Sequence, residues 1–312
     1  MQPEHSFDVI IVGGSYAGLS AAMALGRSLR NVLIIDSGKP CNRQTPHSHN
    51  FLTRDGETPA QISAIAREQV LRYPTVTFLT DLAAKVESDQ HEFVIETVSG
   101  QRFATGKLLL ATGVEDLMPP IQGFAECWGR SVLHCPYCHG YEVQGQRLGI
   151  LANGETAYEL VRLIQHWSQH LTLFTNGTPT LTSEQKQHVT LLGIPLIETE
   201  LVAINHKEGQ LTDLRFADGS LIELDALYSR VPFRQHSDLA NQLGCTTTTS
   251  GLIIANEFGQ TNVAGVYVAG DINSPFRQVS IAVAGGSKAG AWINRELIEA
   301  DLEKRFALPA PT

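Results

Sequence analysis

Two stretches of the chain repeat one order: an apolar strand, a turn of small residues, a helical segment and a second apolar strand. The first stretch opens with the apolar run at 7–12 and closes with the run at 32–35. The second opens at 147–151 and closes at 171–174. The segments between these runs are rich in Ala and Leu, or have apolar residues at helical spacing. Strands that alternate with helices in this way predict an α/β protein with two Rossmann-like dinucleotide-binding folds.

The turn of the first repeat carries the glycines that a dinucleotide-binding fold needs. Gly13 permits the tight turn, Gly18 lets the helix pack closely on the strand, and Ser15 replaces the middle glycine. The helix N-terminus that follows offers N–H groups to a pyrophosphate. Asp36, at the end of the second strand, stands near the distance expected of a ribose-binding carboxylate. These features together predict a bound dinucleotide in the first fold.

Near the middle of the chain, Cys135 and Cys138 form a C-x-x-C motif. A zinc site would need a second pair of ligands, and the other cysteines stand singly, so a redox pair is favoured over half a zinc site. If the motif begins a helix, the helix dipole lowers the pKa of one thiol and favours its thiolate.

Composition restricts the possible partners. The chain has 312 residues and a formal net charge of −9, which argues against nucleic acid or an anionic membrane as the main partner. No apolar stretch is long enough to span a bilayer, and the first residues lack the basic start of a signal peptide. We therefore expect a cytoplasmic protein, in which a C-x-x-C is more often catalytic than structural.

Two further turns extend the pattern over most of the chain. A buried run ends in Ala111, Thr112 and Gly113, and a later one ends in Gly270 and Asp271. Arg277 and Gln278 follow. With these motifs the sequence resembles the low-molecular-weight thioredoxin reductase family of two-domain flavoproteins. Without that resemblance, Asp271 is about equally well explained as a helix N-cap.

The resemblance implies that the first fold binds FAD. It implies an FAD-binding domain made of 1–117 and 239–312, with the C-x-x-C in an inserted NAD(P)-binding-like domain, 118–238. The cofactor-binding residues that we expect are Gly13, Gly14, Ser15, Gly18, Asp36, Ala111, Thr112, Gly113, Gly270, Asp271, Arg277, Gln278 and His49.

The phosphate turn of the second fold departs from the family pattern. Its first glycine is Ala152, whose Cβ crowds the turn. Where thioredoxin reductases have a His-Arg-Arg run that holds the 2′-phosphate of NADPH, this chain has Thr175-Asn176-Gly177. Because a phosphomonoester there loses its bidentate guanidinium partner, we expect NADPH to bind weakly or not at all. Lys186 is the alternative phosphate ligand.

The resemblance also implies roles at the redox pair. In the family the more C-terminal cysteine faces the flavin, which assigns Cys138 to the flavin and Cys135 to substrate. The family's acid after the second cysteine is an aspartate, and here it is His139. A histidine titrates near neutrality and can take a proton from a dithiol, although a packing role is the alternative.

The motif around the cysteines and the segment 42–56 are similar to one branch of the family. That branch includes fungal dithiol oxidases of gliotoxin-like metabolites, which pass electrons to oxygen, and bacterial and cyanobacterial proteins that lack a usable NADPH site. His47 and His49 lie in that segment. We expect a flavin-edge or polar loop rather than a metal site, because no third ligand is evident nearby.

The sequence thus predicts an FAD-dependent thiol/disulfide oxidoreductase that exchanges electrons between the flavin and the Cys135–Cys138 pair. Its thiol partner would be a small dithiol or disulfide, or a thioredoxin-like protein. The terminal electron partner would be oxygen or another carrier, such as a second flavin or ferredoxin. An NADPH-dependent thioredoxin reductase and a non-catalytic flavin redox sensor are the alternatives. The resemblance implies a homodimer.

Overall fold

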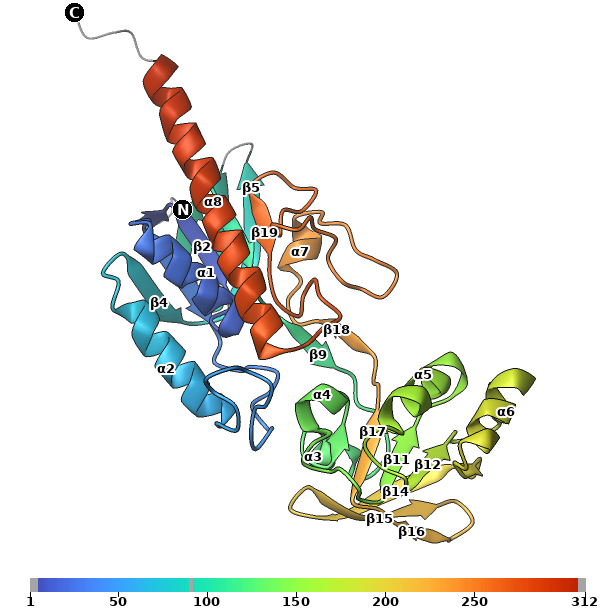
Figure 1. Ribbon diagram of the computed structural model, residues 1–312. Helices are drawn as coiled ribbons and strands as arrows, with labels where there is room; N and C mark the ends of the chain where they lie inside the picture. The colour runs from blue at the N-terminus through green and yellow to red at the C-terminus, as the bar shows by residue number, and fades with distance from the viewer. Residues whose placement is uncertain (1–4, 90–91, 308–312) are drawn as a thin grey trace, which may run out of the picture. The chain divides into compact units, whose positions relative to one another are not determined.

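The computed structural model describes residues 5–89 and 92–307, and the chain divides into two compact units (Figure 1). Unit 1 takes its described residues from 1–43, 60–115 and 233–312, and unit 2 consists of 44–59 and 116–232. The domain bounds expected from the sequence stay a prediction. The segment 44–59 is grouped with unit 2, whereas those bounds assign it to the FAD-binding domain.

A five-stranded parallel sheet forms the centre of unit 1. Every side chain of its middle strand is buried, as is typical of a parallel strand covered on both faces. In spatial order its strands are β19 (Val266–Val268), β8 (Leu108–Leu110), β2 (Val9–Val12), β3 (Val32–Asp36) and β4 (Val76–Thr80).

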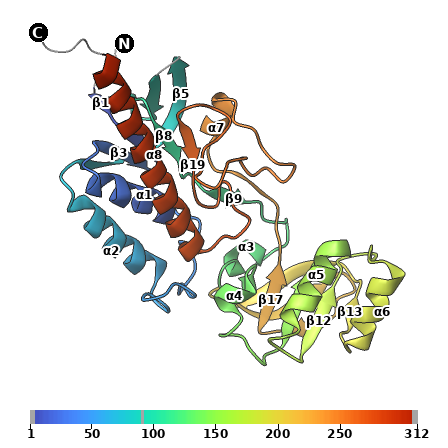
Figure 2. The same ribbon diagram turned by 45° about the horizontal axis from the view of Figure 1, so that its top comes forward.

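Two helices of unit 1 pack on each other at glycines. Helix α1 (Tyr16–Arg27) and the long helix α8 (Val279–Ala307) lie side by side in both ribbon views (Figures 1 and 2). A Cβ on Gly286 or Gly290 would collide with the α1 backbone, so the contact requires glycine there. Helix α2 (Pro59–Leu71) begins with proline at its first position, where the missing N–H of proline costs no helical hydrogen bond.

The remaining strands of unit 1 lie outside the parallel sheet. A four-stranded sheet has the order β1 (His5–Phe7), β7 (Arg102–Thr105), β6 (Glu92–Thr97) and β5 (Ala83–Asp89). Strands β5, β6 and β7 are antiparallel, and β1 pairs parallel to β7. Strand β9 (Val114–Asp116) pairs with β18 (Phe233–Gln235), and α7 (Leu239–Gln242) follows.

Unit 2 contains the second parallel sheet, also of five strands. In spatial order they are β10 (Val132–Leu133), β17 (Ala226–Ser229), β11 (Leu148–Leu151), β12 (Leu171–Phe174) and β13 (Leu196–Ile197). The helices of this fold are α5 (Gly154–Ile164) and α6 (Ser183–Leu191). Trp167 lies beyond the end of α5.

The rest of unit 2 surrounds that sheet. An antiparallel sheet consists of β14 (Leu201–Lys207), β15 (Gln210–Phe216) and β16 (Leu221–Glu223). The short helices are α3 (Phe124–Cys127) and α4 (Pro136–His139). With a Rossmann-like sheet in each unit, the α/β fold class predicted from the sequence is confirmed. Across residues 5–89 and 92–307, we find no helix with the length and apolarity that crossing a membrane requires.

Candidate active site: a cofactor cleft and a redox-active disulfide

The glycine turn of unit 1 opens a cleft at the carboxyl ends of its parallel strands. Added Cβ atoms would drive Gly13 into the carbonyl of Ala111 and Gly18 into the carbonyl of Gly13. Gly13 also has φ +106°, a conformation that side-chain-bearing residues rarely adopt. These two glycines therefore set how closely strand, turn and helix approach one another, as a dinucleotide-binding turn requires.

The cleft holds about 1050 Å³, counting its open mouth. A bound FAD needs a long, partly apolar groove, and the glycine turn gives its backbone side the close approach that a pyrophosphate needs. The chain therefore fits the cofactor. Ten of the sequence-predicted residues line the cleft: Gly13, Ser15, Asp36, Ala111, Thr112, Gly113, Gly270, Asp271, Arg277 and Gln278. Gly14 and Gly18 belong to the turn but not to the lining, and His49 lies in unit 2.

Asp36 also organises the turn itself. One carboxylate oxygen accepts a 2.6 Å hydrogen bond from the Gly14 N–H, and the other accepts one of 2.7 Å from the Gly38 N–H. Each oxygen keeps a further lone pair, so a ribose hydroxyl can still donate to it. The ribose-binding role of Asp36 stays a prediction.

Side chains without a sequence motif also line the cleft. Cys41 accepts a hydrogen bond of 2.9 Å from the Arg277 guanidinium, which lies 3.5 Å from the Asp271 carboxylate. Asn42 donates to the Tyr16 hydroxyl, and burial raises the pKa of Tyr16. Sequence reasoning identified Arg277 and Asp271 as cofactor residues but not Cys41, because Cys41 reaches Arg277 from a segment far away in the chain.

In unit 2 the two cysteines of the C-x-x-C are joined as a disulfide. Cys135 is the N-cap of α4 and Cys138 lies within that helix, so the motif does begin a helix. The Cα atoms lie 5.3 Å apart, within the usual range for a disulfide. Both cysteines are partly exposed and can therefore meet a thiol from outside.

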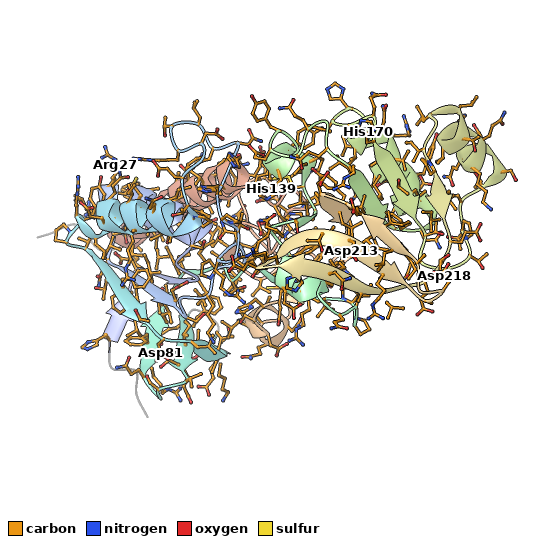
Figure 3. All side chains as sticks on the ribbon, turned by 90° about the horizontal axis from the view of Figure 1, so that it is seen from below. Arg27, Asp81, His139, His170, Asp213 and Asp218 are labelled. Atoms are coloured by element: carbon orange, nitrogen blue, oxygen red, sulfur yellow. A yellow bond between two sulfur atoms is a disulfide. The ribbon has the colours of Figure 1, made fainter. Side chains whose placement is uncertain are left out.

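His139 ends α4, directly after the second cysteine (Figure 3). Burial lowers the pKa of its imidazole, Glu142 acts in the opposite direction, and His49 adds to the lowering. The ring is therefore neutral at pH 7 and can accept a proton. His49 comes from the segment 44–59, and its Nε2 lies 3.5 Å from a carboxylate oxygen of Glu142.

The phosphate turn of the second fold is filled by a side chain. Oδ1 of Asn153 accepts hydrogen bonds from the backbone N–H groups of Gly154 and Thr180, both 2.8 Å long. Its Nδ2 donates to the carbonyls of Thr175 and Thr178. The Asn153 side chain thus accepts the hydrogen bond of the first N–H group of α5. In a nucleotide-binding fold, a pyrophosphate would bind at this helix N-terminus.

At the end of β12, backbone and hydroxyl hydrogen bonds stand where thioredoxin reductases have the arginines that hold the 2′-phosphate of NADPH. Thr175 donates its hydroxyl to the Gly177 carbonyl, and the Gly177 N–H donates to the Glu198 carbonyl. Lys186 lines a shallow pocket at this corner, together with Thr190 and Glu198. The Glu198 side chain in the same pocket would repel a phosphate that Lys186 attracts.

Metal binding has no support in the described part of the chain. No group of three or more His, Cys, Asp or Glu residues there is arranged to hold a metal ion. The rings of His47 and His49 lie 6.4 Å apart, and Nδ1 of His47 lies 2.9 Å from the carbonyl oxygen of Gly56.

Comparisons with known proteins agree with an architecture of two Rossmann-like folds. Residues 7–286 match the family model described as pyridine nucleotide-disulphide oxidoreductase. The chain is 34% identical to thioredoxin reductase tcpT of Claviceps purpurea, over 97% of each chain. It is 32% identical to thioredoxin reductase sirT of Leptosphaeria maculans, over 97% of this chain and 98% of that one.

Solved structures show the same fold. An oxidoreductase from Agrobacterium tumefaciens superposes with a TM-score of 0.89 at 37% identity, over 94% of this chain and 99% of that one. The protein HlmI superposes with a TM-score of 0.90 at 30% identity, over 96% of this chain and 95% of that one. The chain therefore belongs to the pyridine nucleotide-disulphide oxidoreductase family, as an FAD-dependent, thioredoxin-reductase-like disulfide oxidoreductase.

Proposed function

We propose that this protein moves electron pairs between a small dithiol or disulfide and FAD, through Cys135 and Cys138, without using NADPH. The observation that carries the proposal is Asn153, whose side chain takes the helix N-terminal N–H group of the second nucleotide fold. The absence of arginine at the end of β12 also argues against NADPH binding. In place of NADPH, oxygen or another electron carrier, such as a second flavin or ferredoxin, is the terminal partner.

The chain's own residues account for the thiol chemistry. His139, neutral at pH 7, takes the proton of an incoming thiol, and the resulting thiolate attacks the Sγ of Cys135. The Cys135–Cys138 bond breaks and its electron pair leaves on Cys138. The second thiol of the substrate then closes the substrate disulfide and releases Cys135. FAD, when bound, supplies the two-electron acceptor for this pair.

The cofactor-binding and catalytic assignments made from the sequence are part of this proposal. Ten of the cofactor residues share one cleft, and His139 directly follows the cysteine that we assign to the flavin. His49 is retained as a residue near the flavin edge. A homodimer in a reducing cytosol also belongs to the proposal, on the strength of the resemblance and of a C-x-x-C pair with catalytic spacing.

Anaerobic reduction of the flavin tests the proposal. NADPH, NADH, dithiothreitol and reduced ferredoxin are each mixed with the oxidised holoprotein, and the flavin absorbance is followed. We expect dithiothreitol to bleach the flavin and both nicotinamides to leave it oxidised. Rapid bleaching at micromolar NADPH would overturn the proposal. Steady oxygen uptake with a small dithiol then separates an oxidase from a redox sensor that does not turn over.

A specific observation keeps the NADPH-dependent thioredoxin reductase as a second candidate. Lys186 lines a pocket beside the end of β12 and can act as a point charge toward phosphate. The variant Lys186→Gln separates the two: if Lys186 holds NADPH, flavin reduction by NADPH occurs in the parent protein and is lost in the variant.

A further inference from the structure

A cysteine outside the redox pair holds an arginine at the wall of the FAD cleft. The guanidinium of Arg277 donates a hydrogen bond of 2.9 Å to the Sγ of Cys41, and its Nε lies 3.5 Å from a carboxylate oxygen of Asp271. Cys41 follows β3, whereas Asp271 and Arg277 lie between β19 and α8. The guanidinium therefore joins two loops that are distant in the sequence, and all three residues line the cleft.

The contact involves a charge that is mostly shielded from water. The side chain of Arg277 is 15% exposed and that of Asp271 is 22% exposed. A charge in such a place depends on fixed partners, because the loss of one partner leaves it poorly compensated. A hydrogen bond from a charged donor is also stronger than a neutral one. The sulfur of Cys41 therefore helps to fix the position of a positive charge at the cleft wall.

The loop that carries Cys41 is held at a second point. Asn42, the next residue, donates a hydrogen bond of 3.3 Å to the hydroxyl of Tyr16, the first residue of α1. Tyr16 and Asn42 line the same cleft. Because the neighbouring residue is tied to α1, we expect that truncation of the Cys41 side chain leaves a gap beside Arg277 that the loop does not close.

We propose that Cys41 is a positioning residue of the cofactor cleft, whose hydrogen bond to Arg277 sets the affinity for FAD. FAD carries two negatively charged phosphates, so a fixed positive charge in its cleft favours its binding. Cys41 acts through Arg277, and the inference therefore rests on the proposed assignment of Arg277 to the cofactor. It is independent of the terminal electron partner and of NADPH.

Cys41 can be labelled selectively. Cys135 and Cys138 are joined in the disulfide, Cys127 and Cys245 are buried, and Cys41 is partly exposed. Burial also raises the pKa of the Cys127 and Cys245 thiols, which makes them less reactive. Iodoacetamide, whose iodide leaves as the sulfur bonds to carbon, should therefore alkylate the full-length apoprotein first at Cys41. Bound FAD should slow this reaction by roughly tenfold or more, because Cys41 lines the cleft.

A double-mutant cycle on FAD binding tests the coupling between the two side chains. Apoproteins of the parent, Cys41→Ala, Arg277→Gln and the double variant are titrated with FAD, and the quenching of flavin fluorescence gives each Kd. We expect Cys41→Ala to weaken binding roughly tenfold in the parent, and to change nothing further once Arg277 is Gln.

Two further variants control for the chemistry of the side chain. Cys41→Ser keeps a hydrogen-bond acceptor, so its Kd should stay within about threefold of the parent value. Cys245→Ala removes a thiol from the same unit but outside the cleft lining, and its FAD affinity should equal that of the parent.

The outcomes separate this inference from the proposed function. Parent-like binding by Cys41→Ala, equal losses in Cys41→Ala and Cys41→Ser, additive losses in the double variant, or alkylation that FAD does not slow would each refute the positioning role of Cys41. The proposed function would then stand unchanged. Parent-like binding by Arg277→Gln would refute the proposed assignment of Arg277 to the cofactor, and the role of Cys41 would fail with it.

Discussion

The side chain of Asn153 makes five hydrogen bonds, one to the neighbouring Gly154 N–H and four to the segment 175–180. It caps α5 and also ties the helix to the loop that follows β12. In a nucleotide-binding fold, the pyrophosphate would meet these donors. The side chain therefore does locally what the ligand does elsewhere, and the fold keeps its shape without the ligand.

Replacing Asn153 tests this structural role. Asn153→Ala removes the N-cap of α5 and leaves several partly exposed polar groups without their partner, so we expect the free energy of unfolding to fall by about 1–2 kcal/mol. Chemical denaturation measures it, with Thr178→Ala, which alters a neighbouring exposed side chain, as the comparison. The variant should gain no NADPH-driven flavin reduction, because no arginine appears at β12. Appearance of that activity would mean that Asn153 alone blocks the site.

The lowered pKa of His139 has a consequence for stability. Burial holds its pKa in the folded protein below the value in the unfolded chain. Its neutral form therefore contributes stability that is present above the unfolded pKa of about 6.5. That contribution is lost as pH falls through the folded pKa.

Thermal unfolding between pH 7.5 and 5 checks this sign. The parent protein should lose more stability on acidification than His139→Gln, which carries no titrating ring. The two curves should converge at the acid end. A variant that loses stability as steeply as the parent would show that other groups control the acid response.

The contact between α1 and α8 is an element-scale feature that depends on single atoms. Gly286 faces the carbonyl of Ala17, whereas the nearest atoms to a Cβ on the adjacent Gly285 lie 3.8 Å away. Gly286→Ala must therefore push the helices apart, which we expect to cost about 1–3 kcal/mol. Gly285→Ala meets only ordinary contacts and gains helix propensity, so it should be neutral or stabilising.

Denaturation of both apoproteins measures the difference. The FAD-loaded variants are then passed through gel filtration. The fraction of free flavin shows whether the cleft between the glycine turn and the start of α8 loosens as well. Equal stability of the two variants would show that the helices adjust at no cost.

Local pattern was enough to predict the central elements. The runs at β2, β3, β11 and β12 are short and apolar, and helical spacing marks the segments between them, so neighbouring residues alone specify them. Strand β4 (Val76–Thr80) pairs parallel with β3, whereas the strands β5, β6 and β7 that follow it in the chain form an antiparallel sheet. Which sheet a strand joins depends on residues distant in sequence, and its own pattern does not contain that information.

The candidate site shows the same division. Glycine turns and the C-x-x-C have fixed spacings because backbone geometry and disulfide length require them, so they could be found in the sequence. Cys41 belongs to no motif, and Glu142 ends the motif around the cysteines without a role that the sequence assigns to it. Their importance comes from His49 and Arg277, which reach them from segments distant in the chain. Only a structure brings such pairs together.

At the scale of the whole molecule, the division into two compact units predicts two unfolding transitions. Each unit has its own buried core, and chains built this way often depart from a single cooperative transition. The cleft that fits FAD is lined entirely by residues of unit 1, so a ligand there stabilises the part that folds around it. In unit 2 the side chain of Asn153 takes the place of the corresponding ligand, so we expect no such stabilisation there.

Calorimetry of the apoprotein with added FAD or NADP⁺ tests which unit each ligand stabilises. At 100 times its Kd, FAD should stabilise unit 1 by roughly 2.7 kcal/mol and raise its transition temperature. NADP⁺ at the same concentration should move neither transition. Fluorescence of Trp167, which is in unit 2, assigns the transitions when Trp128 and Trp292 are replaced by Phe. An NADP⁺-dependent rise in the Trp167 transition would mean that the second fold still binds its nucleotide, with Lys186 as the first residue to examine.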